Sequence, residues 1–258
     1  MLPFIDTHCH LHAGLDDGPP DVDTALEMCR IVVQDGVRAV AATAHQNPRW
    51  PAANAERIRS GTRELQTRLN EWRIPLDVVP CGEVMVSPKL MDDWSAGRLV
   101  SVADAGRYLL IEMPHGVFLD IRDLVTELME AGLRPILAHP ERCPELWHSP
   151  ATMVDWIRRG CVMQACADSI VGPDKQVHRQ IRHWLARGWV HLVASDGHSL
   201  AARRPGLSAA FDQLTRWTNP AVAERLCCTN GMTILEGLPL VVPQPEPAKR
   251  RWFDIRRK

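Results

Sequence analysis

The chain lacks several features that define large classes of proteins. No run of 18 apolar residues is present that could cross a bilayer, and the first residues lack the basic segment of a secretory signal, so we expect a cytoplasmic protein. The formal net charge is only −1, which gives no electrostatic reason to expect nucleic acid or a membrane as the main partner. The eight cysteines form no C-x-x-C pair, which favours reduced, buried thiols.

Motifs of covalent hydrolysis are also missing. None of the cysteines stands in the C-x-x-x-x-x-R pattern of a cysteine phosphatase, and the sequence contains neither a G-x-S-x-G elbow nor a G-x-x-x-x-G-K loop. A covalent mechanism through cysteine or serine is therefore disfavoured. Water activated by a metal is the nucleophile that remains.

Short apolar segments alternate with amphipathic ones along the 258 residues. The predicted strands are 3–8, 37–43, 76–80, 107–112, 134–138, 161–166 and 190–194. The predicted helices are 22–35, 52–72, 119–131, 150–159, 174–187, 206–217 and 220–228. Strand followed by helix, repeated about seven times, is typical of parallel strands with crossover helices. We therefore expect a single α/β barrel domain over residues 1–240.

The C-terminal segment differs in composition from the rest. A proline-containing linker and a basic tail are expected over residues 241–258, and the last ten residues hold six basic side chains against one acidic. Without those ten residues the net charge is about −6. The tail is thus a basic appendage on an acidic body, and we assign it no catalytic part.

The most informative segment is residues 6–18, D-T-H-C-H-L-H-A-G-L-D-D-G. Alternate residues of a strand share a face, so His8 and His10 should converge with Asp6, whereas Cys9 should face the core. Imidazole and carboxylate groups suit manganese, iron or zinc. The segment therefore predicts a metal site. His12 continues the alternation, and we expect it to be a solvated loop residue rather than a partner of the ligands.

Metal-competent side chains follow almost every predicted strand. In a parallel barrel the active site lies at the carboxyl ends of the strands, so these side chains should meet at one rim. The candidate ligands are His8, His10, Asp17 (or Asp16), His45, Glu83, Glu112, His139, Asp196 and His198. One catalytic ion usually takes three or four protein ligands. This set therefore suits two or three ions, with Glu83 or Asp196 bridging, and favours hydrolysis of a phosphate ester.

Arginines near the same rim point to phosphate. Arg142 follows His139 in H-P-E-R, where its guanidinium could bind phosphoryl oxygens in fork geometry. Arg203 and Arg204 follow the S-D-G-H segment, and the doubled arginine leaves open which of them meets phosphate. Two further side chains are candidates for minor roles: His115 as a proton donor, and Trp50 as a surface for an aryl ring.

These motifs resemble those of the PHP (polymerase and histidinol phosphatase) superfamily. Within it the chain is similar to the bacterial manganese-dependent protein-tyrosine phosphatases of capsular and exopolysaccharide gene clusters. The resemblance covers most of residues 4–240 through H-C-H, D-D-G-P, G-E-V, I-E-M-P, H-P-E-R and S-D-G-H with R-R-P behind. One departure is Ala44, where the family usually has a proline before the histidine of the second strand.

The resemblance implies a distorted (β/α)7 TIM-like barrel, three metals and phosphate-binding arginines. It makes the nine candidates metal ligands for manganese, with iron, zinc, cobalt or magnesium as other choices. It also implies a substrate such as the phosphotyrosine-containing tail of a bacterial tyrosine kinase. Three alternatives stay open: a small-molecule phosphatase of the histidinol phosphate kind, a PHP exonuclease, and a metal-binding regulatory module without turnover.

Overall fold

The computed structural model describes residues 2–243 and residue 245. Most of the predicted basic tail lies outside the described residues, so the proposed division at residue 240 stays a prediction. Within the described part, no helix is both long and apolar enough to cross a membrane.

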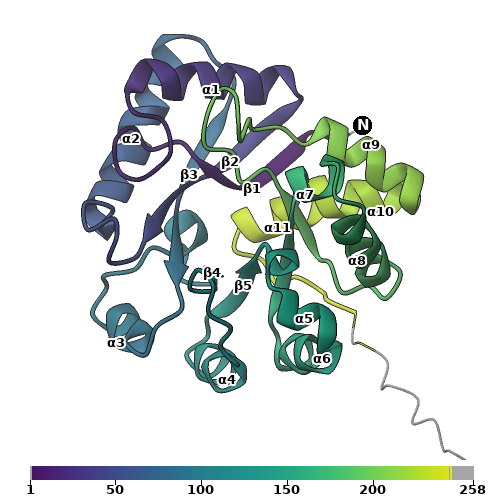
Figure 1. Ribbon diagram of the computed structural model, residues 1–258. Coiled ribbons are helices and arrows are strands. Elements are labelled where there is room, and N and C mark those ends of the chain that lie inside the picture. Colours follow the sequence, from purple (N-terminus) through teal and green to yellow (C-terminus); the bar gives the residue numbers. More distant parts are fainter. Residues whose placement is uncertain (1, 244, 246–258) are drawn as a thin grey trace, which may run out of the picture.

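Seven parallel strands form one sheet in the order of the sequence, and the sheet curls into a barrel surrounded by helices (Figure 1). The strands are β1 (Phe4–His10), β2 (Val37–Gln46), β3 (Asp77–Met85), β4 (Tyr108–Glu112), β5 (Arg134–Ala138), β6 (Val162–Cys166) and β7 (Leu192–Ala194). The barrel closes between β1 and the segment after β7. There, the amide of His10 donates to the carbonyl of Gly197 at 2.8 Å, and the amide of Asp196 donates to the carbonyl of His8 at 2.8 Å. The predicted seven-stranded α/β barrel is confirmed.

Three strands that carry candidate ligands, β1, β2 and β3, extend further at their carboxyl ends than predicted. The strand predicted over residues 76–80 ends at Pro80. In the structure the pairing with β2 continues past Pro80, through His45 opposite Glu83, to Gln46 opposite Val84. The candidate ligands of β2 and β3 therefore lie on paired strands rather than in loops, which fixes their positions more firmly.

Helices cover the outside of the barrel and its amino end. The helices are α1 (Val22–Gln34), α2 (Ala55–Glu71), α3 (Leu90–Ser95), α4 (Arg122–Glu130), α5 (Pro144–His148), α6 (Pro150–Arg159), α7 (Ala167–Val171), α8 (Lys175–Leu185), α9 (Ser208–Trp217), α10 (Pro220–Glu224) and α11 (Asn230–Leu235). Three further short elements are η1 (Val102–Asp104) before β4, the turn η2 (Pro140–Arg142) after β5, and the π-helical η3 (Arg225–Thr229) between α10 and α11. The short helices α3, α5, α7 and α11 were not predicted from the sequence.

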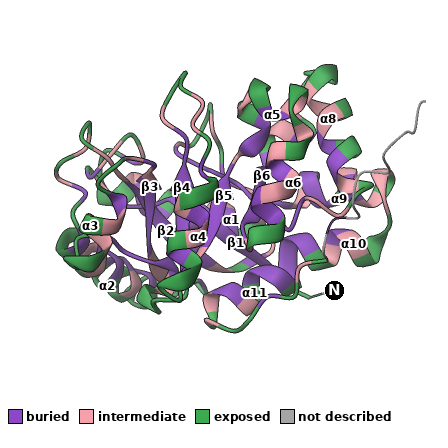
Figure 2. Ribbon diagram, turned by 90° about the horizontal axis from the view of Figure 1, so that it is seen from below, coloured by how far each residue is buried: buried purple, intermediate pink, exposed green. Residues whose placement is uncertain are grey.

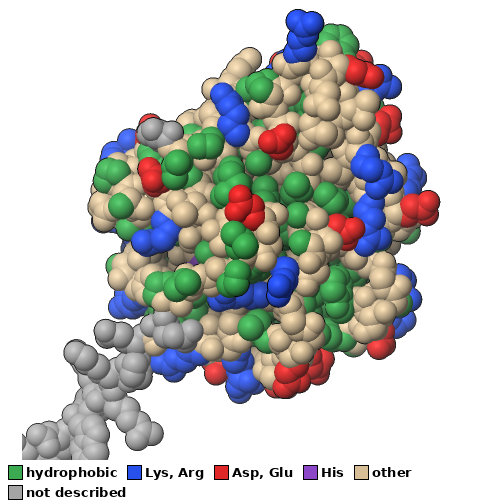
Figure 3. Space-filling view, turned by 180° about the vertical axis from the view of Figure 1, so that it is seen from behind, with side chains coloured by type: hydrophobic (Ala, Val, Ile, Leu, Met, Phe, Trp, Pro, Cys, Tyr) green, Lys and Arg blue, Asp and Glu red, His purple; other side chains and the backbone are tan. Residues whose placement is uncertain are grey.

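The inside of the barrel is apolar at its amino end and polar at its carboxyl end. Ala41, Leu110, Ile136 and Val162 fill the interior from four strands, and Ile234 of α11 packs against them. Figure 2 shows α11 at the same end of the molecule as the N-terminus, where it covers the barrel. Figure 3, from behind the view of Figure 1, shows hydrophobic side chains gathered at the middle of that face among scattered charges of both signs. Polar side chains of the strands are thus left to the opposite end.

Candidate metal centre

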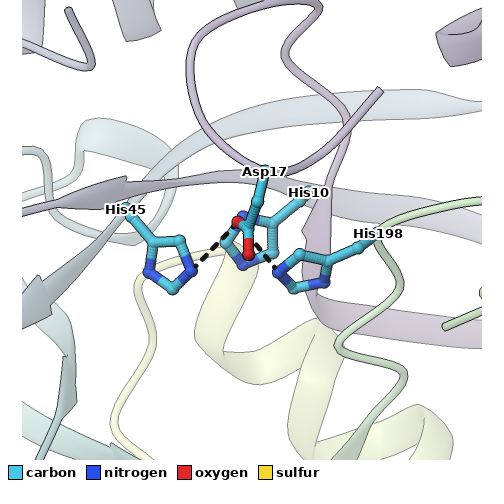
Figure 4. Close-up of side chains that lie close together, drawn as sticks. All are labelled: His10, Asp17, His45 and His198. Carbon is cyan, nitrogen blue, oxygen red and sulfur yellow. Dashed lines mark ion pairs between the residues drawn. The ribbon is translucent and has the colours of Figure 1, made fainter. Parts of the chain in front are cut away.

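The predicted ligands meet at the carboxyl end of the barrel. Eight of the nine form three groups whose potential ligand atoms lie within 4.8 Å of one another. The groups are His10, Asp17, His45 and His198; His8, His10 and Asp196; and His45, Glu83 and Glu112. Figure 4 shows the first group, with the Asp17 carboxylate between the rings of His45 and His198. Because His10 and His45 each belong to two groups, the three groups form one continuous site.

Glu83 is the centre of this arrangement. Its Oε2 lies 3.0 Å from Nδ1 of His45 and 3.3 Å from Nε2 of both His8 and His10. Its Oε1 lies 3.0 Å from Nε2 of His139, the ninth candidate. One carboxylate therefore contacts imidazoles from β1, β2 and the end of β5, which is the placement expected of a bridging ligand.

Several buried polar atoms of the site lack ordinary partners. Oε2 of Glu83, Oδ1 of Asp196 and Nε2 of His198 make no contact with hydrogen-bond geometry within the described residues, although imidazole nitrogens lie 3.0 to 3.3 Å from Oε2 of Glu83. Buried polar groups are nearly always hydrogen-bonded, so such a concentration of unpaired atoms calls for an explanation. Divalent ions coordinated by imidazole nitrogens and carboxylate oxygens would satisfy these atoms, and this donor set suits manganese, iron or zinc.

The protonation states of two candidate ligands, Glu83 and His198, also suit metal binding. Burial alone would raise the pKa of Glu83, but His8, His10, His139 and His45 hold it well below its ordinary value. Burial, assisted by the neighbouring His10, lowers the pKa of His198 to about 3. The carboxylate of Glu83 is therefore ionised and the imidazole of His198 is neutral, which are the forms that bind metal.

The structure separates the roles of Asp16 and Asp17. Oδ2 of Asp16 accepts a hydrogen bond from Nδ1 of His10 at 2.7 Å and from the amide of His45 at 2.9 Å. Its Oδ1 accepts from the amide of Gly18 at 2.9 Å. Burial lowers the pKa of His10, but the carboxylate of Asp16, assisted by that of Glu83, more than offsets this and raises it to about 9. Asp16 thus orients a ligand ring, while Asp17 presents its carboxylate to the cluster.

A second ring is oriented from β6, the one strand without a predicted ligand. Oε1 of Gln164 lies 3.0 Å from Nδ1 of His8, and its Nε2 donates to Oγ1 of Thr7 at 2.8 Å. With Nδ1 of His8 engaged in this way, Nε2 faces Glu83 and Asp196. A neutral amide inside a strand gave no sequence signal, so this residue was missed.

Two candidate ligands have strained backbones. His139 has φ 36° and Asp196 has φ 54°, both in the left-handed region that non-glycine residues rarely adopt. Such conformations persist where the surrounding structure imposes them, and they are concentrated at functional sites. His139 directly follows β5, and Asp196 comes two residues after the end of β7. At these positions the left-handed backbone directs both side chains toward the carboxyl end of the barrel.

Arg142 and Arg203 converge on the same carboxylate oxygen. Nη1 of Arg142 and Nη2 of Arg203 each lie 2.7 Å from Oδ2 of Asp196. Nη2 of Arg142 also donates to Sγ of Cys166 at 3.3 Å. Arg204 is exposed and does not line the cavity at the site. The two guanidinium groups that reach the cluster are therefore those of Arg142 and Arg203.

A buried carboxylate fixes the turn that carries Arg142. Oε1 of Glu141 accepts a hydrogen bond from the amide of Cys166 at 2.8 Å, and the carbonyl of Glu141 accepts from Nε1 of Trp147 at 3.0 Å. These bonds tie η2 to the end of β6 and to α5. Arg142 itself forms its ion pair with Asp196 rather than with the neighbouring Glu141 or Glu145.

An open cavity of about 530 Å³ lies against the cluster. Asp17, His45, Glu112, His139, Arg142 and Arg203 form its polar end. Apolar side chains form other parts of its wall, among them Trp50, Met85, Met113 and Phe118. His115 is exposed and also lines the cavity. The volume is sufficient for a small ligand.

The expectation for His12 was wrong, whereas that for Cys9 holds. β1 ends at His10, so the strand alternation does not reach His12. Its ring is buried, and Nε2 donates to the carbonyl of Ala42 at 3.0 Å. Cys9 is fully buried in the apolar core and outside the three groups of ligands.

A parallel barrel that holds clustered imidazoles, carboxylates and two arginines at the carboxyl ends of its strands defines a metallohydrolase of the α/β-barrel class. Comparison with known sequences makes this more specific. The chain belongs to the CpsB/CapC family of capsular polysaccharide synthesis, whose sequence pattern matches residues 4–236.

Individual relatives cover nearly the whole chain. The tyrosine-protein phosphatase YwqE of Bacillus subtilis is 29% identical over 96% of this chain and 98% of its own length. The putative tyrosine-protein phosphatase CapC of Staphylococcus aureus is 24% identical over 98% and 100%. A solved structure from work on YwqE and on CpsB of Streptococcus pneumoniae, described as metal-dependent tyrosine phosphatases, superposes with a TM-score of 0.88 at 29% identity, covering 95% of this chain and 100% of that one.

Proposed function

We propose that this protein is a metal-dependent protein-tyrosine phosphatase. The observation that carries the proposal is the convergence of a multidentate metal site with Arg142 and Arg203 at one end of a cavity. The named activity of its relatives supports the same reaction. The small-molecule phosphatase, exonuclease and regulatory-module alternatives have no such support.

We infer that two or three divalent ions, manganese foremost, occupy the cluster. The residues that would hold them are His8, His10, Asp17, His45, Glu83, Glu112, His139, Asp196 and His198. When bound, such ions supply a hydroxide nucleophile near neutral pH and neutralise charge on the phosphoryl group. Asp16 and Gln164 keep Nε2 of His10 and of His8 directed at the ions.

Arg142 and Arg203 bind the phosphoryl group. Each guanidinium has five N–H donors and uses only part of them on Asp196 and Cys166. Both side chains are about one-third or more exposed, at 41% and 35%, and both line the cavity. Their remaining donors are therefore free to bind phosphate oxygens and to stabilise the charge that develops in the transition state.

The cavity wall favours an aryl ester over an alkyl one. Trp50 is half-buried with Arg49 stacked on its ring at 5.2 Å, and Phe118 and Met85 are also half-buried at the wall. A phosphotyrosine ring would bury apolar surface against these groups, whereas a charged alkyl chain such as that of histidinol phosphate would not. Tyrosinate is a weak base, so protonation of the leaving group, for example by His115, contributes little.

The substrate is a tyrosine-phosphorylated protein of the capsule or exopolysaccharide machinery. We propose the phosphotyrosine-containing tail of a bacterial tyrosine kinase, because a flexible tail can bring its phosphotyrosine into an open cavity at the end of a barrel. The family's association with capsular polysaccharide synthesis supports this choice.

Substrate comparison tests the proposal. With manganese present, the purified protein should hydrolyse a phosphotyrosyl peptide with a much higher kcat/KM than a phosphoseryl peptide or histidinol phosphate. Iodoacetamide should leave this activity intact, since seven of the eight thiols are buried and burial raises the pKa of the eighth, Cys143, to about 11. Activity that prefers histidinol phosphate, or that is lost on alkylation, contradicts the proposal.

A further inference from the structure

Helix α8 carries a row of cations that the metal centre does not use. Lys175, Arg179 and Arg182 stand at positions i, i+4 and i+7 and therefore share one face of the helix, and Arg187 follows just beyond its end. These four residues are called the α8 stripe. No acidic residue occurs between 175 and 187, although the first 248 residues carry a net charge of about −6. The stripe is a local reversal of the charge of the body.

The cations of the stripe are exposed and unneutralised. All four side chains are solvent-exposed, and within the described residues none has a carboxylate within ion-pair distance. Arg182 lies over the ring of Trp217 at 5.9 Å, and His178 contacts the same ring edge-on at 5.1 Å. Like charges spaced at i and i+4 destabilise a helix. An anionic ligand would turn this unfavourable arrangement into a favourable one.

The stripe borders a hollow rather than a flat surface. A groove of about 640 Å³ lies between α8 and the end of α9, lined by Lys175, Arg179, Arg182 and Arg187 together with Trp217. Helix α8 also approaches η2, the turn that bears Arg142. Figure 2 shows α8 beside α5 at the end of the molecule opposite the N-terminus. The helix that carries the stripe is thus packed against the turn that bears Arg142.

We propose that the α8 stripe binds an anionic stretch of the substrate polypeptide, with carboxylate or phosphate groups, near the phosphotyrosine that occupies the cavity. This inference rests on the proposed function, and it adds a docking surface to it. Arginines and a lysine beside a tryptophan suit carboxylates and phosphates, which accept from guanidinium in fork geometry. A peptide that reaches from the cavity across η2 would meet the stripe next.

A membrane surface fits the stripe less well. A helix that lies on a bilayer exposes apolar residues opposite its cations and inserts them among the lipids. In α8 the large apolar residues Ile181 and Trp184 are fully buried in the protein core instead. Only electrostatic contact with lipid would remain, and the hollow shape favours discrete anionic groups on a chain.

Peptide kinetics with paired charge variants test the inference. The double variant Arg179→Gln/Arg182→Gln removes two cations of the stripe, and Arg57→Gln/Arg63→Gln removes two exposed cations of α2 as a matched control. The substrates are a phosphotyrosyl peptide flanked by glutamates, a doubly phosphorylated peptide, a peptide flanked by glutamines, and p-nitrophenyl phosphate. Each exposed ion pair contributes up to about fivefold in affinity. At a typical two- to threefold for each pair, loss of both cations in the stripe variant should raise KM for the two anionic peptides by about fivefold.

The other substrates separate this inference from the proposed function. KM for the glutamine-flanked peptide and kcat for p-nitrophenyl phosphate should stay at wild-type values in both variants. The control variant should leave KM for all peptides unchanged. An unchanged KM for both anionic peptides in the stripe variant overturns the docking proposal. If that variant also loses the binding to phosphatidylglycerol vesicles that the wild type shows, the stripe is assigned to a membrane surface instead. Failure of the wild type to hydrolyse any phosphotyrosyl substrate overturns the proposed function instead.

Discussion

The substitution Asp16→Asn should weaken metal binding, although Asp16 lies outside the three groups of candidate ligands. Both of its carboxylate oxygens are acceptors: Oδ2 for Nδ1 of His10 and the amide of His45, and Oδ1 for the amide of Gly18. An asparagine must place its NH2 group against at least one of these donors. In either orientation Nδ1 of His10 loses the charged acceptor that lies 2.7 Å away in the wild type, and a neutral amide oxygen holds the ring less firmly.

The expected loss can be stated in numbers. Removing the carboxylate that orients a ligand histidine typically costs about 10- to 100-fold in metal affinity, or about 1.4 to 2.7 kcal/mol. The buried donors left without an acceptor should also lower the free energy of unfolding of the metal-free protein by about 1 to 3 kcal/mol.

Two measurements check these values. Isothermal titration of the chelator-treated protein with Mn²⁺ gives the affinity, and urea unfolding in the presence of EDTA gives the stability. Asp23→Asn, an exposed position in the first turn of α1, is the matched control and should change neither quantity. If Asp16→Asn binds Mn²⁺ within twofold of the wild type, the orienting role of Asp16 is refuted.

Two other predictions concern the arginines and acid stability. Arg142→Ala and Arg203→Ala should each lower kcat/KM on an aryl phosphate by about 100-fold, because each removes a guanidinium that donates hydrogen bonds to the phosphoryl group. Arg204→Ala should change kcat/KM by less than about twofold. Equal losses for Arg203→Ala and Arg204→Ala contradict the assignment. His12 is buried and burial lowers its pKa to about 4, so as the pH falls below about 6.5 the unfolded chain takes up this proton before the folded one. Its contribution to stability should therefore be lost between about pH 6.5 and 4, at about 1.4 kcal/mol per pH unit. The variant His12→Asn cannot take up this proton, so in that range the slope of its unfolding free energy against pH should be smaller by the equivalent of about one proton. An unchanged slope means that His12 is protonated in the folded state.

Much of the barrel was predictable because its signals are local and repeated. Apolar runs marked each strand, and residues of metal-binding type stood near the strands' carboxyl ends, so convergence followed from parallel topology alone. The extent of β3 was not predictable, since pairing with β2 carries the strand through Pro80. The short helices α3, α5 and α7 have too few residues for the spacing of their apolar side chains to show a helical period.

The residues that orient the ligands could not be found in the sequence. Gln164 is a neutral amide within an apolar strand, and only the barrel brings it to His8, which is 156 positions away. Asp16 and Asp17 are adjacent and of the same type, so the direction of each side chain had to come from the loop geometry. Likewise, only the structure distinguishes Arg203 from Arg204, because it shows that Arg203 contacts Asp196.

Hydrolysis by this protein should depend on two or three ions bound at the carboxyl end of the barrel. The most direct test is to remove metal with a chelator, add back Mn²⁺ in measured amounts, and determine bound metal and phosphotyrosine hydrolysis on the same samples. The metal-free protein should be inactive, and its activity should return as bound metal reaches two to three ions per chain. Full activity with fewer than one ion per chain would contradict this dependence.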